Sequence, residues 1–123
     1  MSLTREQILS NKSFRSKTIE IPEWGGEVRL KAMSGADREA MESVVYEDVG
    51  GKLQIKKGVS YMAEMLLRTW CDDDGNLLFK PDEINLIQEK DSVILARIFK
   101  VAAEVNGLSG DEEKVIEKNS EAV

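Results

Sequence analysis

One segment near the end of the chain constrains the fold more than any other. A helix over residues 93–105 would be apolar on more than one face, through Val93, Ile94, Leu95, Ile98, Phe99, Val101, Ala102 and Val105. A helix with so much apolar surface belongs in the interior of a domain. Asp91 or Ser92 can cap its start, and Asn106-Gly107-Leu108 has the form of a Schellman motif at its end. The sequence therefore predicts a central helix that other elements must cover.

A β-hairpin is the second predicted element. Thr18-Ile19-Glu20-Ile21 and Val28-Arg29-Leu30-Lys31 both alternate polar and apolar residues, as half-buried strands do. Pro22 and the Gly25-Gly26 pair between them are typical turn residues. A lone hairpin is only marginally stable in water, so we expect helices to cover its apolar face.

Helical spacing of apolar residues predicts further helices over residues 34–45, over 60–71 and from Pro81 onward, and Thr4 and Gln7 form a capping box that opens a short helix. The polar, glycine-flanked stretch 50–58 is predicted to be a mobile loop, although residues 53–55 could pair briefly as a strand. We therefore expect an α+β, mainly α fold, in which an N-terminal β-hairpin packs against about four helices. Residues 1–108 should form a single globular domain, followed by an acidic tail, 109–123, that frays.

Catalytic chemistry has little support in this sequence. The chain contains no histidine, which removes the commonest general base and the commonest metal ligand. The acidic residues from Asp72 to Glu83 could supply calcium ligands, but Leu77 would stand where a calcium loop needs glycine. The two glycine pairs lack the spacing of a phosphate-binding loop. We therefore expect no enzyme activity, no catalytic residues, no cofactor and no metal ion.

The balance of charge and apolar residues bears on partners and location. The 17 basic and 23 acidic residues give a net charge of −6 without a large basic cluster, which disfavours nucleic-acid binding. No apolar run approaches the ~20 residues of a membrane-spanning helix, and the first residues do not form a secretion signal. The single cysteine, Cys71, fits a buried thiol in a reducing compartment. These features predict a cytoplasmic protein with no membrane or nucleic-acid partner.

A few large apolar residues are candidates for contact with a protein partner. They are Trp24, at the hairpin turn, and four methionines on or beside the two middle helices: Met33, Met41, Met62 and Met65. Tryptophan is enriched in binding hot spots, and flexible methionines suit adaptable binding surfaces. The alternative is that Trp24 caps the core at the hairpin end and that the methionines fill the core.

The order of several segments resembles that of the tail assembly chaperones of long-tailed bacteriophages and prophages. The resemblance is carried by Thr4-Arg5-Glu6-Gln7-Ile8-Leu9, by residues 21–30 with Pro22-Glu23-Trp24-Gly25-Gly26, by Met33-Ser34-Gly35-Ala36-Asp37-Arg38, by residues 73–79 and by residues 98–109 with Asn106-Gly107-Leu108-Ser109. Lys80 departs from the pattern, because similar proteins often have a capping Thr or Ser there.

The resemblance implies a chaperone that binds the tape measure protein and keeps it soluble during tail morphogenesis. It implies action in the cytoplasm of the bacterial host and absence from the mature virion. Further expected partners are a longer, frameshifted form of the chain, the tail tube protein and a second copy in a homo-oligomer. A frameshift site could lie in the codons for Glu117–Asn119. The alternatives are a structural or connector component of the phage tail, an enzyme, and a nucleic-acid-binding regulator.

Overall fold

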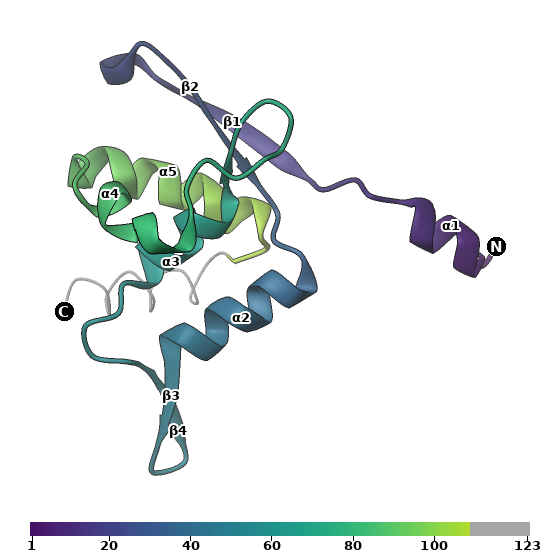
Figure 1. Ribbon diagram of the computed structural model, residues 1–123, viewed down its shortest axis with the longest axis horizontal. Coiled ribbons are helices and arrows are strands. Elements are labelled where there is room, and N and C mark those ends of the chain that lie inside the picture. Colours follow the sequence, from purple (N-terminus) through teal and green to yellow (C-terminus); the bar gives the residue numbers. More distant parts are fainter. Residues whose placement is uncertain (109–123) are drawn as a thin grey trace.

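A computed structural model describes residues 1–108 (Figure 1). The predicted tail, residues 109–123, lies outside the described residues. So does the segment Glu117–Asn119, whose codons could contain a frameshift site. In chain order, the described residues form α1 (Arg5–Ser10), β1 (Ser16–Ile21), the 3-10 helix η1 (Pro22–Trp24), β2 (Gly26–Lys31), α2 (Gly35–Val45), β3 (Tyr46–Val49), β4 (Lys52–Ile55), α3 (Tyr61–Thr69), β5 (Trp70–Cys71), the 3-10 helix η2 (Pro81–Glu83), α4 (Ile84–Gln88) and α5 (Ser92–Val105).

Helix α5 is buried along most of its length, as its sequence predicts. Its buried residues are Ile94, Leu95, Ile98, Phe99, Ala102, Ala103 and Val105. An Oδ1 atom of Asp91 accepts hydrogen bonds from the backbone N–H groups of Val93 and Ile94, which caps the start of the helix. At the other end, Gly107 has a φ of 74° and the Leu108 N–H donates to the Ala103 carbonyl at 2.8 Å. The predicted Schellman ending is confirmed.

The larger sheet has three strands in the order β1-β2-β5 and packs on α5. β1 and β2 pair in antiparallel fashion, with Ile19 opposite Val28, and Ile21, Val28 and Leu30 are buried. β5 continues directly from α3 and pairs with β2, placing Trp70 opposite Leu30. The sheet thus brings the end of α3 to the strand that precedes α2.

The predicted α+β class is correct, but its description as mainly α, with an N-terminal hairpin packed against about four helices, is wrong. Residues 1–108 contain five α-helices and two sheets, and α1 precedes the hairpin strands. The stretch 50–58 is not a loop throughout, because the alternative of a strand at residues 53–55 is confirmed: β3 and β4 form a second sheet, pairing from Tyr46 opposite Ile55 to Val49 opposite Lys52. β5 was missed because Trp70 and Cys71 continue the apolar stripe of the preceding helix, while pairing with β2 depends on residues distant in sequence.

Helix α1 stands apart from the rest of the structure. The predicted capping box is present: the Thr4 hydroxyl accepts from the Gln7 N–H, and the Gln7 side chain accepts from the Thr4 N–H. None of its residues is buried, and it projects away from the body of the fold on the side opposite α4 (Figure 1).

Candidate partner-binding surface

The five residues expected to contact a partner occupy two different environments. Met41 and Met65 lie in the hydrophobic core, with 1% and 0% of their surface exposed. Trp24 is 41% exposed, and Met33 and Met62 are half-buried at the edge of the core. The structure therefore does not bring the five side chains together on one face. Trp24 ends η1, Met33 follows β2 and Met62 lies in α3, so the three side chains that are not in the core come from different elements.

The exposed tryptophan lies flat on a second tryptophan. The rings of Trp24 and Trp70 are stacked, with centroids 6.0 Å apart and an angle of 6° between their planes. Trp70 also meets the edge of Phe79, at a centroid distance of 5.2 Å. One face of Trp24 is thus used within the fold, and the exposed remainder is rigidly presented.

An ion pair fixes the turn that carries Trp24. The carboxylate of Glu23 accepts hydrogen bonds from Nη1 and Nη2 of Arg97 at 3.1 and 2.8 Å, which joins the hairpin to α5. These hydrogen bonds are the main reason that the pKa of Glu23 falls to about 2. The long sequence separation of the pair explains why sequence patterns did not reveal it.

Met62 lines a shallow apolar depression, which we call the α3–α4 groove. Its lining residues are Ser60, Met62, Ala63 and Leu66 of the α3 region, Ile87 and Gln88 of α4, and Leu95 of α5. Its volume is about 190 Å³, which is below the ~300–1,000 Å³ typical of small-molecule sites. A depression of this size suits apolar side chains of a protein partner better than a whole small ligand.

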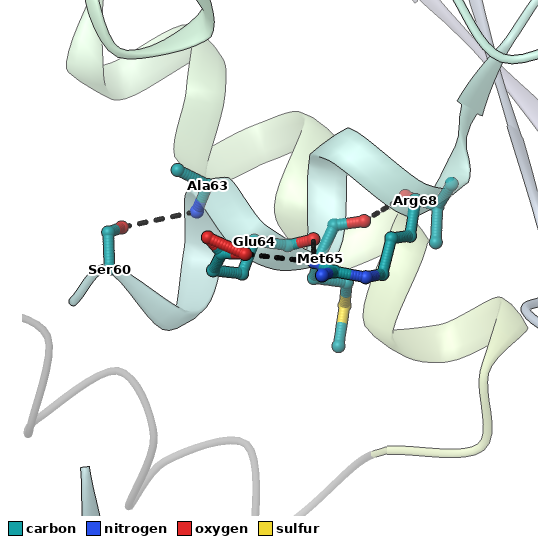
Figure 2. A network of polar contacts seen from close by, with 6 residues as sticks. Ser60, Ala63, Glu64, Met65 and Arg68 are labelled. Atoms are coloured by element: carbon teal, nitrogen blue, oxygen red, sulfur yellow. Dashed lines mark hydrogen bonds and ion pairs between the residues drawn. The ribbon is translucent and has the colours of Figure 1, made fainter. Parts of the chain in front are cut away.

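A set of polar contacts holds the helix that forms one wall of this groove. Ser60 Oγ accepts from the Ala63 N–H at 3.1 Å and caps α3 (Figure 2). Arg68 Nη1 donates to Oε1 and to the backbone carbonyl of Glu64, both at 2.9 Å, and both side chains are largely buried. Thr69 Oγ1 donates to the Met65 carbonyl at 2.8 Å. These contacts lie within the α3 region and stabilise the helix that forms one wall of the groove.

The backbone of Met33 is hydrogen-bonded to the side chain of a buried residue, Asn106. The sequence predicts Asn106 only as part of the ending of the central helix. Asn106 Oδ1 accepts from the Met33 N–H at 2.8 Å, and Nδ2 donates to the carbonyls of Ala102 at 2.8 Å and Lys31 at 3.5 Å. Arg38 Nη1 donates to the Asn106 carbonyl at 3.2 Å. Asn106 is only 6% exposed, so this residue joins the exit of β2, the start of α2 and the end of α5.

Further exposed apolar side chains lie on two projecting segments. Leu3, Ile8 and Leu9, in and beside α1, are 69%, 57% and 57% exposed, and Val49 and Leu53 on the β3–β4 hairpin are 50% and 75% exposed. Both segments extend from the body of the fold (Figure 1). Apolar patches that remain exposed in a folded protein commonly mark interaction surfaces.

The polar groups considered for chemistry are engaged within the fold. Asp72 Oδ1 accepts from the backbone N–H groups of Asp74 and Asn76, and the hydrogen bond from Asn76 is the main cause of its lowered pKa. Cys71 is buried, and burial raises the pKa of its thiol. Within residues 1–108, no three His, Cys, Asp or Glu side chains gather in a way that could hold a metal ion. No helix in that range is both long and apolar enough to cross a membrane.

Comparison with known proteins gives a family for this arrangement. The family described as phage tail assembly chaperone matches residues 4–120. A structure titled as that of the bacteriophage HK97 tail assembly chaperone is similar, with a TM-score of 0.57 and 24% sequence identity over 85% of this chain and 95% of that chain. That likeness concerns the fold. No curated protein matches the chain. Because the family match spans nearly the whole sequence, the chain belongs to the phage tail assembly chaperones.

Proposed function

We propose that this chaperone binds the tape measure protein and keeps it soluble while the phage tail is assembled. The observation that carries the proposal is the family match over residues 4–120. A tape measure protein is long and helical, and it needs its apolar surface covered before tail tube subunits enclose it. The exposed apolar residues at the hairpin turn and on the β3–β4 hairpin give this chain more than one place at which to meet such surface.

Trp24 is the residue we assign as the principal contact with the tape measure protein. It is exposed, held rigidly by the stack on Trp70, and of the residue type most enriched in binding hot spots. Met33 is proposed as a supporting contact with the tape measure protein and Met62 as a contact with a second copy of the chain, because flexible thioethers adapt to varied apolar partners. Met41 and Met65 support the surface from within the core.

The wider proposal follows from the same role. The chaperone acts without catalysis, in the cytoplasm of the bacterial host, and leaves before the virion is complete. Residues 1–108 act as one globular unit, and the acidic tail follows it. A longer frameshifted form, the tail tube protein and a second copy of the chain are its further partners.

Co-expression with the tape measure protein tests the proposal. We expect the tape measure protein to remain in the soluble fraction and to co-purify with the chaperone. Trp24→Ala should reduce the soluble fraction, whereas Leu78→Ala, which removes another exposed apolar residue near the sheet, serves as the matched control. A tape measure protein that stays insoluble with and without the chaperone would refute the function.

Mass spectrometry of purified virions tests the location. We expect no peptides from this chain in the mature particle. Abundant peptides would instead favour a structural or connector component of the tail.

A further inference from the structure

The N-terminal arm, residues 1–15, carries exposed apolar side chains that the rest of the described structure does not cover. Leu3, Ile8 and Leu9 are all more than half exposed, and α1 has no buried residue. An isolated helix of six residues is only marginally stable in water, because its packing contacts do not offset the free-energy cost of nucleating it. The capping box satisfies polar groups at the helix start but buries no apolar surface. The arm is therefore suited to docking on another surface.

The arm is held at its root and directed away from its own domain. The Ala32 N–H donates to the Arg15 carbonyl at 2.8 Å, and Lys31 Nζ lies 5.5 Å from the centroid of the Phe14 ring. From this root, α1 extends to the side of the molecule opposite α4 (Figure 1). The five residues 11–15 can span at most ~18 Å. The arm therefore does not cover the α3–α4 groove of its own domain.

The α3–α4 groove has the complementary character. It presents an apolar surface with Met62, Leu66 and Leu95. Helix α4, which supplies Ile87 and Gln88 to the lining, lies within an acidic segment of the sequence, residues 81–91. Residues 81–91 contain four acidic residues and one basic residue, whereas the arm contains three basic residues and one acidic residue. Opposite charges around an apolar contact steer association and fix its register.

We propose that the arm of one copy docks into the α3–α4 groove of a second copy. Ile8 and Leu9 enter the groove, and Arg5 and Lys12 face the acidic segment that contains α4. The proposal rests on the self-association included in the proposed function, and it identifies the segment and surface involved. Because arm and groove lie on opposite sides of the domain, each contact leaves a free arm at one end and a free groove at the other. Such a contact can repeat from copy to copy along a partner.

Sedimentation of the full chain over a range of concentrations tests the contact. The wild type should self-associate, more weakly as salt is raised. Ile8→Ser combined with Leu9→Ser in the arm, and Gln88→Lys in the groove, should each weaken association by roughly tenfold or more. All three residues are exposed, so both variants should keep the wild-type circular dichroism spectrum. Leu53→Ser, on the β3–β4 hairpin, should associate like the wild type.

Mixing the two defective variants gives the sharpest readout. The arm variant keeps an intact groove and the groove variant keeps an intact arm, so the mixture should form a complex that neither variant forms alone. A monomeric wild type, an arm variant that associates normally, or a mixture that stays monomeric would each overturn the proposal. If the wild type is monomeric and the Gln88→Lys variant fails to keep the tape measure protein soluble, the groove binds the tape measure protein rather than a second copy. The sedimentation assay contains no tape measure protein, so its outcome is separate from the test of the proposed function.

Discussion

Replacing Asn106 by Ala should destabilise the chaperone strongly, although the residue lies at the end of a helix. The substitution removes the acceptor for the Met33 N–H and the donor to the Ala102 carbonyl, both at 2.8 Å, and a longer bond to the Lys31 carbonyl. The backbone at this position, with φ −93° and ψ 10°, is accessible to alanine, so no strain accompanies the change.

The magnitude follows from which groups lose their partners. A donor that is shielded from solvent and loses its acceptor costs about 1–3 kcal/mol, which we take for the partly buried Met33 N–H, and a lost hydrogen bond costs about 1 kcal/mol. The Ala102 carbonyl still accepts from the Asn106 N–H at 3.2 Å, which limits the second cost. We therefore expect Asn106→Ala to lower the free energy of unfolding by about 2–4 kcal/mol.

Urea unfolding followed by circular dichroism measures this loss. Asn85→Ala is the matched control, because Asn85 is exposed on α4, and it should change the free energy of unfolding by less than ~0.5 kcal/mol. The reasoning is refuted if Asn106→Ala lowers the free energy of unfolding by less than ~1 kcal/mol. The hydrogen bonds of the buried Asn106 amide would then contribute no more than an average surface contact.

Three further predictions address other parts of the fold. The pKa of Glu23 is lowered from 4.5 to about 2, so as the pH falls through that range the unfolded state takes up a proton before the folded state does. In urea titrations, the wild type should therefore lose stability in that pH range more steeply than Glu23→Gln. An equal pH dependence of the two proteins would contradict the ion pair with Arg97. Cys71 is buried with a raised pKa, so a thiol reagent should modify it slowly in the native protein and rapidly in denaturant; fast native modification would show that the site opens. In urea unfolding, Asp91→Ala should lower the free energy of unfolding by about 1 kcal/mol because α5 loses its cap. Asp91→Asn keeps a capping oxygen and should lower it little; equal losses for the two variants would show that the charge of Asp91, not the cap, is responsible.

The sequence predicts the elements whose signals are local. The central helix was found because its apolar positions, its Asp91 cap and its Gly107 ending all point to the same limits. The strands around Ile19 and Val28 were found because they alternate in polarity and flank a clear turn. In both cases the determining interactions lie within a few residues of one another.

The missed elements have two different causes. The β3–β4 hairpin carried a usable signal, because Gly50 and Gly51 both have positive φ in the turn between Val49 and Lys52, and a glycine pair favours that turn. The polarity of residues 50–58 favours a loop, whereas the glycine pair and the possible strand at residues 53–55 favour the hairpin that the structure contains. β5 carried no local signal, because its pairing with β2 depends on contact between distant residues.

The candidate site was less predictable than the fold. Helical spacing places Met65 within the buried stripe of α3 and Met62 at its edge, so the difference between them is contained in the pattern. By contrast, the stack of Trp24 on Trp70 and the isolation of α1 depend on the assembled structure. Composition alone shows neither which methionines reach the surface nor which helix lacks a partner.

The most direct test of the central claim uses purified components. Denatured tape measure protein is diluted into buffer with increasing amounts of the chaperone, and aggregation is followed by light scattering. The account predicts that the wild type suppresses scattering in a dose-dependent and saturable way, and that Trp24→Ala requires more protein for the same effect. Scattering that is unchanged at every ratio of wild-type chaperone to tape measure protein would contradict the claim.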